Sequence, residues 1–226
     1  GGWERPNWFA PDGVEAVDVP SFGRANWFEH VGSEHRAVRD GVAMIDQTSF
    51  AKFEITGPGA LDAVQWLSVA DMDTPIGAAV YTQLCNERGG IECDLTMTRT
   101  APDSWYVVTG SAFGSHDMSW IRSQVGDSVV LRDLTSSRAV VNLCGPMARR
   151  VLEQVAEDDV SNEAFAYATA RELTVGSAPV LALRIGYVGE LGWELHIPTE
   201  FAAHVAEVLR EAGAAFGLRD VGYRAI

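Results

Sequence analysis

The stretch that decides the fold reads Ala51-Lys52-Phe53-Glu54-Ile55-Thr56-Gly57-Pro58. Its first five residues alternate in polarity, which predicts a half-buried strand, and Gly57-Pro58 suits a turn into the first turn of a helix. The same order returns later, where the strand expected at 139–143 precedes Gly145-Pro146. Two copies of a strand, a Gly-Pro turn and a helix indicate two related units rather than one minimal domain.

The chain around these two copies predicts further elements. A Gly-rich loop at 86–90 joins the alternating runs 80–84 and 91–98, which is typical of a β-hairpin. A helix is expected at 26–40, with Asn26 as its N-cap and Gly41 as its stop. A second helix is expected after Pro58, with the apolar stripe Leu61, Val64, Leu67 and Val69. Further helices are expected at 114–123, 147–155 and 201–215. Further strands are expected at 105–109, 129–131, 139–143, 180–187 and 192–198, after an irregular arm at 3–20.

Hairpins and helices that are segregated along the chain favour an α+β fold over a doubly wound parallel sheet. Between 51 and 131 the order strand–helix–strand–strand–strand–helix–strand resembles a split βαβ unit with one extra strand. Two packed α+β modules of this kind explain a length of 226 residues, which is long for one small domain and short for two full ones.

Composition and motifs exclude several function classes. The 17 Lys and Arg against 31 Asp and Glu leave a net charge of −14, which repels nucleic-acid phosphates and anionic lipids, so neither nucleic acid nor a membrane is an expected partner. No dinucleotide fingerprint, phosphate loop or zinc-protease motif is present, the five histidines are scattered, and no metal site is expected. The three cysteines form no C-x-x-C pair, which favours reduced, buried thiols.

The chain begins Gly1-Gly2-Trp3 without a Met, so it is expected to start inside a longer protein. Reduced thiols fit a cytoplasm-like compartment. The expected location is the cytoplasm of a bacterial cell, or the mitochondrial matrix if the source is eukaryotic.

Two segments remain unexplained by these patterns. In the first, 81–94, Asp94 shares a strand face with Glu92 and Thr96, and that face is either solvated or lines a cleft. In the second, 187–194, two glycines interrupt a strand-like run around Glu190. From the pattern alone, a solvated Asp94 and an exposed Glu190 at a hairpin tip are the favoured interpretations.

Together these segments resemble the signatures of the folate-binding aminomethyltransferase family, that of the T-protein of the glycine cleavage system. The matching residues are Tyr81…Asn86-x-x-Gly89-Gly90-Ile91-x-x-Asp94 and Tyr187-x-Gly189-Glu190-x-Gly192-x-Glu194, with Ser49-Phe50-Ala51-Lys52-Phe53 and Gly145-Pro146 as further landmarks. Trp3-Glu4-Arg5-Pro6-Asn7-Trp8-Phe9 and Leu191 are closest to the C-terminal folate domain of dimethylglycine and sarcosine dehydrogenases or oxidases.

The resemblance implies a discontinuous first folate-binding module at 1–50 and 136–226 and an inserted ferredoxin-like module at 51–135, without the family's C-terminal β-barrel. It implies roles for four residues. Asp94 matches the catalytic aspartate, where a carboxylate can accept a proton or stabilise a cationic iminium. Tyr81 and Tyr187 match tyrosines around the pterin, and Glu194 matches the carboxylate that grips its paired N–H donors. Glu190 is assigned no direct role.

The implied cofactor is tetrahydrofolate, which receives a one-carbon unit from an amine-derived iminium or aminomethyl donor and becomes 5,10-methylenetetrahydrofolate. FAD is expected only in an N-terminal oxidase domain, and a flavin oxidase domain or a carrier protein is the possible partner. The family continues past Arg224-Ala225-Ile226 with an arginine that contacts folate, so its lack here implies weaker binding. Two alternatives stay open: a folate-dependent S- or O-demethylase on the same scaffold, and a non-catalytic folate-binding module.

Overall fold

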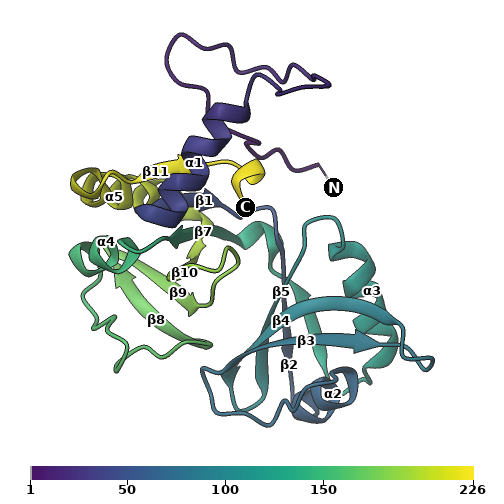
Figure 1. The fold of residues 1–226 in the computed structure, drawn as a ribbon. Helices are drawn as coiled ribbons and strands as arrows, with labels where there is room; N and C mark the ends of the chain where they lie inside the picture. The colour runs from purple at the N-terminus through teal and green to yellow at the C-terminus, as the bar shows by residue number, and fades with distance from the viewer. Residues whose placement is uncertain (1) are drawn as a thin grey trace.

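The computed structural model describes residues 2–226 and contains two sheets that lie side by side, with helices packed against them (Figure 1). The six-stranded sheet has the order β11 (Arg219–Val221), β1 (Ala43–Asp46), β7 (Arg138–Cys144), β10 (Gly192–Pro198), β9 (Ala178–Arg184) and β8 (Thr169–Val175). The five-stranded sheet has the order β3 (Ala79–Cys85), β4 (Ile91–Ala101), β5 (Ser104–Thr109), β2 (Ala51–Thr56) and β6 (Val130–Asp133). The predicted α+β class is confirmed.

The five-stranded sheet is antiparallel throughout. Without the edge strand β3, its order β4-β5-β2-β6 is that of a split βαβ unit, and β3 is the extra strand that the sequence predicts. The strands of the six-stranded sheet come from both sides of this segment along the chain. A module that is interrupted along the chain by a second, inserted module requires this arrangement. The boundaries of the two modules stay a prediction.

Five α-helices accompany the sheets in the described chain. They are α1 (Phe28–Asp40), α2 (Ala60–Leu67), α3 (Gly114–Gln124), α4 (Ala148–Val155) and α5 (Ala202–Gly213). Helices α2 and α3 cover one face of the five-stranded sheet, and α4 and α5 cover one face of the six-stranded sheet. Short 3₁₀ turns complete the regular structure at Thr135–Ser137, Thr199–Phe201, Ala214–Phe216 and Tyr223–Ala225. None of these helices has the length and apolar character needed to cross a membrane.

The two Gly-Pro turns need glycine for a steric reason. Gly57 has φ 126°, and a Cβ there would lie 2.4 Å from the Ser128 carbonyl oxygen. Gly145 has φ 114°, and a Cβ would lie 2.5 Å from the Gly41 carbonyl oxygen. Both values belong to a region that L-residues rarely adopt. The repeated motif therefore encodes the same backbone turn in both sheets.

Three sequence predictions of element bounds are wrong. Asn26 is not an N-cap, because its side chain instead bonds the backbone of Val17 and Val19 before a helix that begins at Phe28. Val69 lies beyond the end of α2 and is 62 % exposed, since the helix stops at Leu67. The strand expected at 180–187 ends at Arg184, so the residues after it form a loop. Strands β1, β8 and β11 are additional to those predicted.

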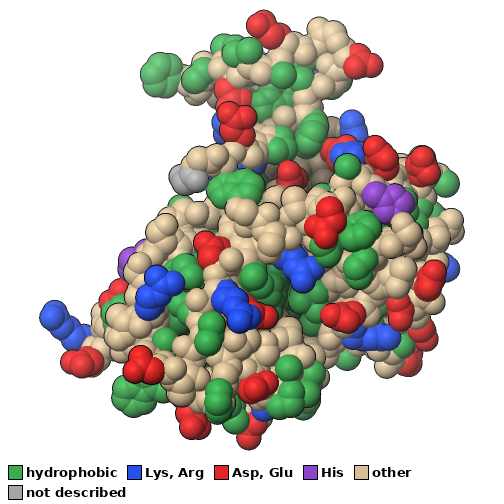
Figure 2. Space-filling model, turned by 180° about the vertical axis from the view of Figure 1, so that it is seen from behind, with side chains coloured by type: hydrophobic (Ala, Val, Ile, Leu, Met, Phe, Trp, Pro, Cys, Tyr) green, Lys and Arg blue, Asp and Glu red, His purple; other side chains and the backbone are tan. Residues whose placement is uncertain are grey.

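The N-terminal arm is irregular, as predicted, and projects from the molecule beside α1 (Figures 1 and 2). Trp8 is its buried anchor, and the indole Nε1 donates to Asp18 at 2.7 Å. Phe22 lies fully exposed in the projecting part. The arm therefore positions its first residues against the fold and leaves an apolar projection in solvent.

Candidate functional site

Asp94 and Tyr81 lie on the face of the five-stranded sheet that the helices leave free. Alternation along β4 buries Cys93, Leu95 and Met97 against α2 and α3, and so turns Asp94 the other way. Gln83 stands directly opposite Asp94 in the β3–β4 pair, and its Nε2 lies 3.5 Å from Oδ1 of Asp94. A hydrogen-bonding interaction with Asp94 raises the pKa of the Tyr81 phenol. Tyr81 is therefore a proton donor beside an accessible carboxylate.

Glu194 lies on the inner face of the six-stranded sheet. Strand β10 sends Trp193 and Leu195 into the core under α4 and α5, so Glu194 and His196 emerge on the opposite side. Glu194 is only 4 % exposed and stands opposite Asn142 of β7. A carboxylate this buried needs hydrogen-bond donors, and among residues 2–226 its side-chain donor is His196, with Nε2 3.3 Å from Oε2.

The inner faces of the two sheets meet around these residues. Phe50, Tyr106 and Val108 form a small apolar cluster with Leu181 of the six-stranded sheet and with Tyr223. Tyr106 on β5 also contacts His196, with its hydroxyl oxygen 2.9 Å from Nδ1. Asp94 and Glu194 are thus carried on facing surfaces of two sheets that contact each other.

The loop between β9 and β10 carries Tyr187 and Glu190. Tyr187 is 60 % exposed and packs edge-on against Phe50, with the ring centroids 6.2 Å apart. Glu190 is not an exposed hairpin tip, because its carboxylate forms an ion pair with Arg39 of α1 at 2.7 Å and its side chain is 19 % exposed. Glu190 therefore ties the loop to α1, while Tyr187 stays accessible.

Two residues that the sequence did not single out also reach this region. Tyr223 follows β11, and burial raises the pKa of its phenol; the neighbouring Tyr187 and Glu194 act in the same direction, and Arg5 opposes them. The Arg5 guanidinium carbon lies 3.5 Å from the centroid of the Tyr223 ring. No local pattern assigns either residue to the site, since they come from opposite ends of the chain and meet only in the fold.

Two buried amides beside Glu194 carry unpaired polar atoms. Asn142 donates from Nδ2 to Oε1 of Gln47 at 3.5 Å, whereas Nε2 of Gln47 and Oδ1 of Asn142 have no partner within the part of the chain that the structure describes. Both side chains are essentially fully buried. A buried donor and acceptor left open are costly unless a ligand or water satisfies them. With Glu194 they form a set that fits the edge of a polar heterocycle bearing both N–H and C=O groups.

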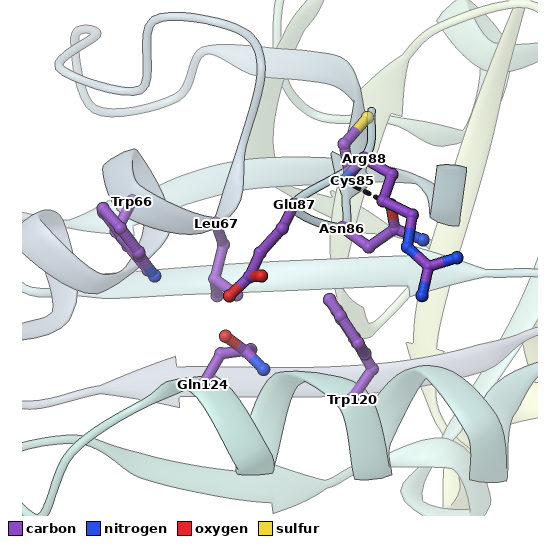
Figure 3. Close-up of a pocket in the computed structure, with 8 residues that line it drawn as sticks. All are labelled: Trp66, Leu67, Cys85, Asn86, Glu87, Arg88, Trp120 and Gln124. Carbon is purple, nitrogen blue, oxygen red and sulfur yellow. Dashed lines mark hydrogen bonds between the residues drawn. The ribbon is translucent and has the colours of Figure 1, made fainter. Parts of the chain in front are cut away.

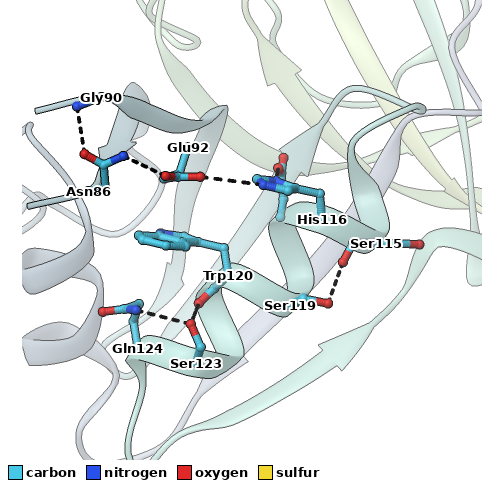
Figure 4. A network of polar contacts seen from close by, with 10 residues as sticks. Asn86, Gly90, Glu92, Ser115, His116, Ser119, Trp120, Ser123 and Gln124 are labelled. Atoms are coloured by element: carbon cyan, nitrogen blue, oxygen red, sulfur yellow. Dashed lines mark hydrogen bonds and ion pairs between the residues drawn. The ribbon is translucent and has the colours of Figure 1, made fainter. Parts of the chain in front are cut away.

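The glycine-rich signature before Asp94 proves to shape a loop. Oδ1 of Asn86 accepts hydrogen bonds from the backbone N–H groups of Arg88 and Gly90, each at 3.0 Å, and Gly89 has φ 77°. Nδ2 of Asn86 donates to Oε1 of Glu92 at 2.7 Å (Figure 4). The other carboxylate oxygen of Glu92, Oε2, lies 3.6 Å from Nε2 of His116. These residues hold the hairpin, and hence β4, against α3.

A cavity of about 680 Å³ opens on the other side of the same sheet (Figure 3). It is lined by Trp66, Leu67, Cys85, Asn86, Glu87, Arg88, Trp120 and Gln124, which come from α2, α3, the end of β3 and the hairpin loop. The helix-covered face of the sheet carries it, away from Asp94. A second cleft of about 490 Å³ lies between the sheets and includes Tyr106, Arg138 and Leu181 in its lining.

Three possible metal-ligand atoms come together below β4, among the described residues. The atoms belong to Cys93, His116 and Asp117 and lie within 4.8 Å of one another. Each group already has protein partners: Asp117 accepts from Thr109 at 2.6 Å and lies 3.0 Å from Nδ1 of His116. Burial and the adjacent Asp117 raise the pKa of the Cys93 thiol. This cluster is best explained as a hydrogen-bonded support for α3.

Comparisons with known proteins place the chain in one family. Residues 1–226 match the family model described as the GCVT N-terminal domain. The chain is 38 % identical over 226 residues to 4-methylaminobutanoate oxidase (formaldehyde-forming) of Paenarthrobacter nicotinovorans, covering 100 % of this chain and 27 % of that protein. It is 35 % identical over 228 residues to mitochondrial dimethylglycine dehydrogenase of Mus musculus, and the match covers 100 % of this chain and 26 % of that protein.

A shorter relative and a solved structure agree with this. An aminomethyltransferase of Shouchella clausii is 30 % identical over 211 residues, covering 93 % of this chain and 57 % of that protein. The crystal structure of glycine cleavage system aminomethyltransferase T from Bartonella henselae matches with a TM-score of 0.76 and 25 % identity, covering 92 % of this chain and 56 % of that one. The chain spans about a quarter of the length of the first two relatives. Because the family model matches its whole length, this chain belongs to the GCVT family of folate-binding aminomethyltransferase domains.

Proposed function

We propose that this chain binds a reduced folate between its two sheets and promotes one-carbon transfer to it, yielding 5,10-methylenetetrahydrofolate. The observation that carries the proposal is the pairing of two carboxylates on facing sheets: accessible Asp94 on β4 and buried Glu194 on β10. They differ in environment, and that difference suits two different tasks. Family membership supports the assignment of folate as the ligand.

Glu194 is proposed to hold the pterin. Its carboxylate can accept two parallel N–H donors, and the open Nε2 of Gln47 and Oδ1 of Asn142 would pair with the remaining polar edge. Tyr187 and Tyr81 are exposed aromatic rings that can pack on a flat heterocycle. Bound in this way, the folate supplies the nucleophilic ring nitrogen.

Asp94 is proposed to act at the reacting nitrogen. A carboxylate there can accept the proton that the attacking amine loses, and its charge stabilises a cationic iminium donor. Gln83 and Tyr81 lie beside it and can hold its orientation through hydrogen bonds. The chain is thus proposed to position the folate and the donor and to stabilise the cationic donor by charge.

The donor is proposed to be a small iminium or aminomethyl compound made by a flavin oxidase domain or delivered by a carrier protein. The relatives named as an oxidase and a dehydrogenase, of which this chain covers about a quarter, support an oxidising partner. We propose a bacterial cytoplasm or a mitochondrial matrix as the location, since both kinds of source occur among the relatives.

Calorimetric titration with 5-formyltetrahydrofolate tests the proposal. Saturable heat from the wild-type chain is expected, and Glu194→Gln is expected to weaken binding by about tenfold or more because it removes the charge from a buried hydrogen-bond acceptor. Glu200→Gln is a matched control at an exposed glutamate after β10. Absence of heat from the wild type up to millimolar ligand would contradict the proposal for this chain.

A further inference from the structure

His196 joins the two sheets through a chain of three polar side chains. It is fully buried on β10, and its Nδ1 lies 2.9 Å from the hydroxyl of Tyr106 on β5. On its other side, Nε2 lies 3.3 Å from Oε2 of Glu194. The Tyr106 and His196 rings meet edge-on, with centroids 5.1 Å apart and planes at 87°. The imidazole therefore bridges the proposed pterin-binding carboxylate and the opposite sheet.

The chemistry of the three groups sets the direction of the hydrogen bonds. A carboxylate oxygen can only accept, so Nε2 of His196 must carry the proton that lies between it and Glu194. A neutral imidazole then accepts at Nδ1, and the Tyr106 hydroxyl is the donor there. Burial lowers the pKa of His196, and the cations Lys52 and Arg138 act in the same direction, while Glu194 opposes them. Tyr106 keeps its proton, because burial raises its pKa.

We propose that His196 is a positioning residue that fixes the Glu194 carboxylate for its ligand, with Tyr106 holding the imidazole ring in place from the other sheet. The inference rests on the proposed folate function and deepens it. With Oε2 held by Nε2–H, the carboxylate cannot rotate freely, and its other oxygen and remaining lone pairs stay available. Because Tyr106 belongs to the other sheet, the geometry of the binding edge depends on how the two sheets pack together.

A purely structural role makes a different prediction. If His196 only filled the contact between the sheets, an aromatic residue of similar shape would serve equally well for ligand binding, whatever occupied position 194. If His196 acts through Glu194, its loss matters only while the carboxylate is present. The two readings therefore separate in a double-mutant cycle.

The experiment is calorimetric titration of 5-formyltetrahydrofolate into the wild type, His196→Phe, His196→Gln, Glu194→Gln and the double variant. His196→Phe is expected to weaken binding about tenfold to a hundredfold, and His196→Gln to recover most of this, because its amide can donate to Glu194. In the Glu194→Gln background, His196→Phe is expected to add less than about threefold. Independent, multiplying losses would overturn the inference, as would wild-type affinity in a folded His196→Phe chain.

A failure of the proposed folate binding gives a different result from a failure of the proposed role of His196. If the wild type binds no 5-formyltetrahydrofolate, the proposed function fails before His196 is tested. His35→Gln, at an exposed histidine of α1, controls for changes unrelated to the site. Thermal melting of each variant shows whether it has folded.

A spectroscopic readout keeps the inference testable without ligand. In the chain labelled with ¹⁵N-histidine, His196 is expected to be neutral and protonated on Nε2 at about pH 8, because burial lowers its pKa. Tyr106→Phe is expected to leave the proton on Nε2, because Glu194 still accepts it, to shift the Nδ1 signal, because Nδ1 loses its donor, and to weaken folate binding. A His196 signal protonated on Nδ1 in the wild type would overturn the inference, and an Nδ1 signal unchanged by Tyr106→Phe would overturn the role of Tyr106.

Discussion

Nζ of Lys52 lies 2.8 Å from the carbonyl oxygen of Arg138, although Lys52 belongs to the five-stranded sheet and Arg138 begins a strand of the six-stranded one. The same ammonium donates to the Thr48 carbonyl at 2.7 Å. Lys52 is completely buried, so its charge is held between the sheets by backbone oxygens. These bonds tie β2 to the start of β7 at the edge of the proposed site.

Lys52 should make stability rise with pH above neutrality. Burial lowers its pKa from 10.5 to about 8, against the opposing effect of Asp133 and Asp46. Between these two values the unfolded chain binds a proton that the folded chain has released, so the free energy of unfolding increases with pH there and the penalty is fully present below about pH 8. In urea unfolding, the free energy of unfolding of the wild type should therefore rise relative to that of Lys52→Met as the pH increases above about 8, by on the order of 1–3 kcal/mol. Parallel pH profiles would show that Lys52 does not titrate in this range.

Asp94→Asn should separate binding from transfer. The amide keeps the size of the side chain but loses its charge and basicity, so 5-formyltetrahydrofolate binding should change by less than about threefold while transfer falls by about a hundredfold or more. Transfer is measured as 5,10-methylenetetrahydrofolate formed from an aminomethyl donor, with Asp127→Asn as a control at an exposed aspartate.

The same assay decides between the alternatives. Wild-type turnover of sulfonium or methoxyaryl donors, without turnover of the aminomethyl donor, would favour a demethylase. Equal behaviour of Asp94→Asn and the wild type in every assay would favour a non-catalytic folate-binding module.

One cysteine of three should react in the folded chain. Cys85 is half-buried beside the 680 Å³ cavity, whereas Cys93 and Cys144 are buried. Burial raises the pKa of Cys144 to about 12 and also raises that of Cys93, and only the thiolate attacks an alkylating agent. Iodoacetamide at about pH 8 should add one group, at Cys85, as located by peptide mass spectrometry. Cys85→Ser should then show no labelling, and alkylation of Cys93 or Cys144 at a similar rate would contradict the prediction.

The two turn glycines should resist substitution. Gly145→Ala and Gly57→Ala each place a Cβ within 2.5 Å of a carbonyl oxygen at positive φ, so each should lower the free energy of unfolding by about 2–4 kcal/mol. Gly126→Ala is the matched control, because its added Cβ would meet no non-neighbouring atom of the described residues within 4 Å, and its effect should stay within about 0.5 kcal/mol. Urea denaturation measures all three, and equal stability of Gly145→Ala and Gly126→Ala would contradict the steric argument.

Local sequence predicted most of the regular structure because strand alternation and turn chemistry act between near neighbours. The 86–90 loop and the Gly-Pro turns appear where expected, with the hairpin β3–β4 between them. The short strands β1 and β11 were missed, since three or four residues carry too little periodicity to be recognised and pair only with partners remote in sequence. Asn26 was misassigned because its side chain found backbone partners in the arm instead of the helix.

The sequence by itself determined which side of each strand is apolar, and hence that Asp94 and Glu194 turn away from the two helix-covered cores. Only the tertiary structure decided that the sheet face with Asp94 lies opposite the sheet face with Glu194. That arrangement depends on contacts such as Tyr106 with His196, which are 90 residues apart, and on the meeting of Arg5 with Tyr223. Such contacts follow from the burial of whole sheet faces, a property that no short stretch of sequence contains.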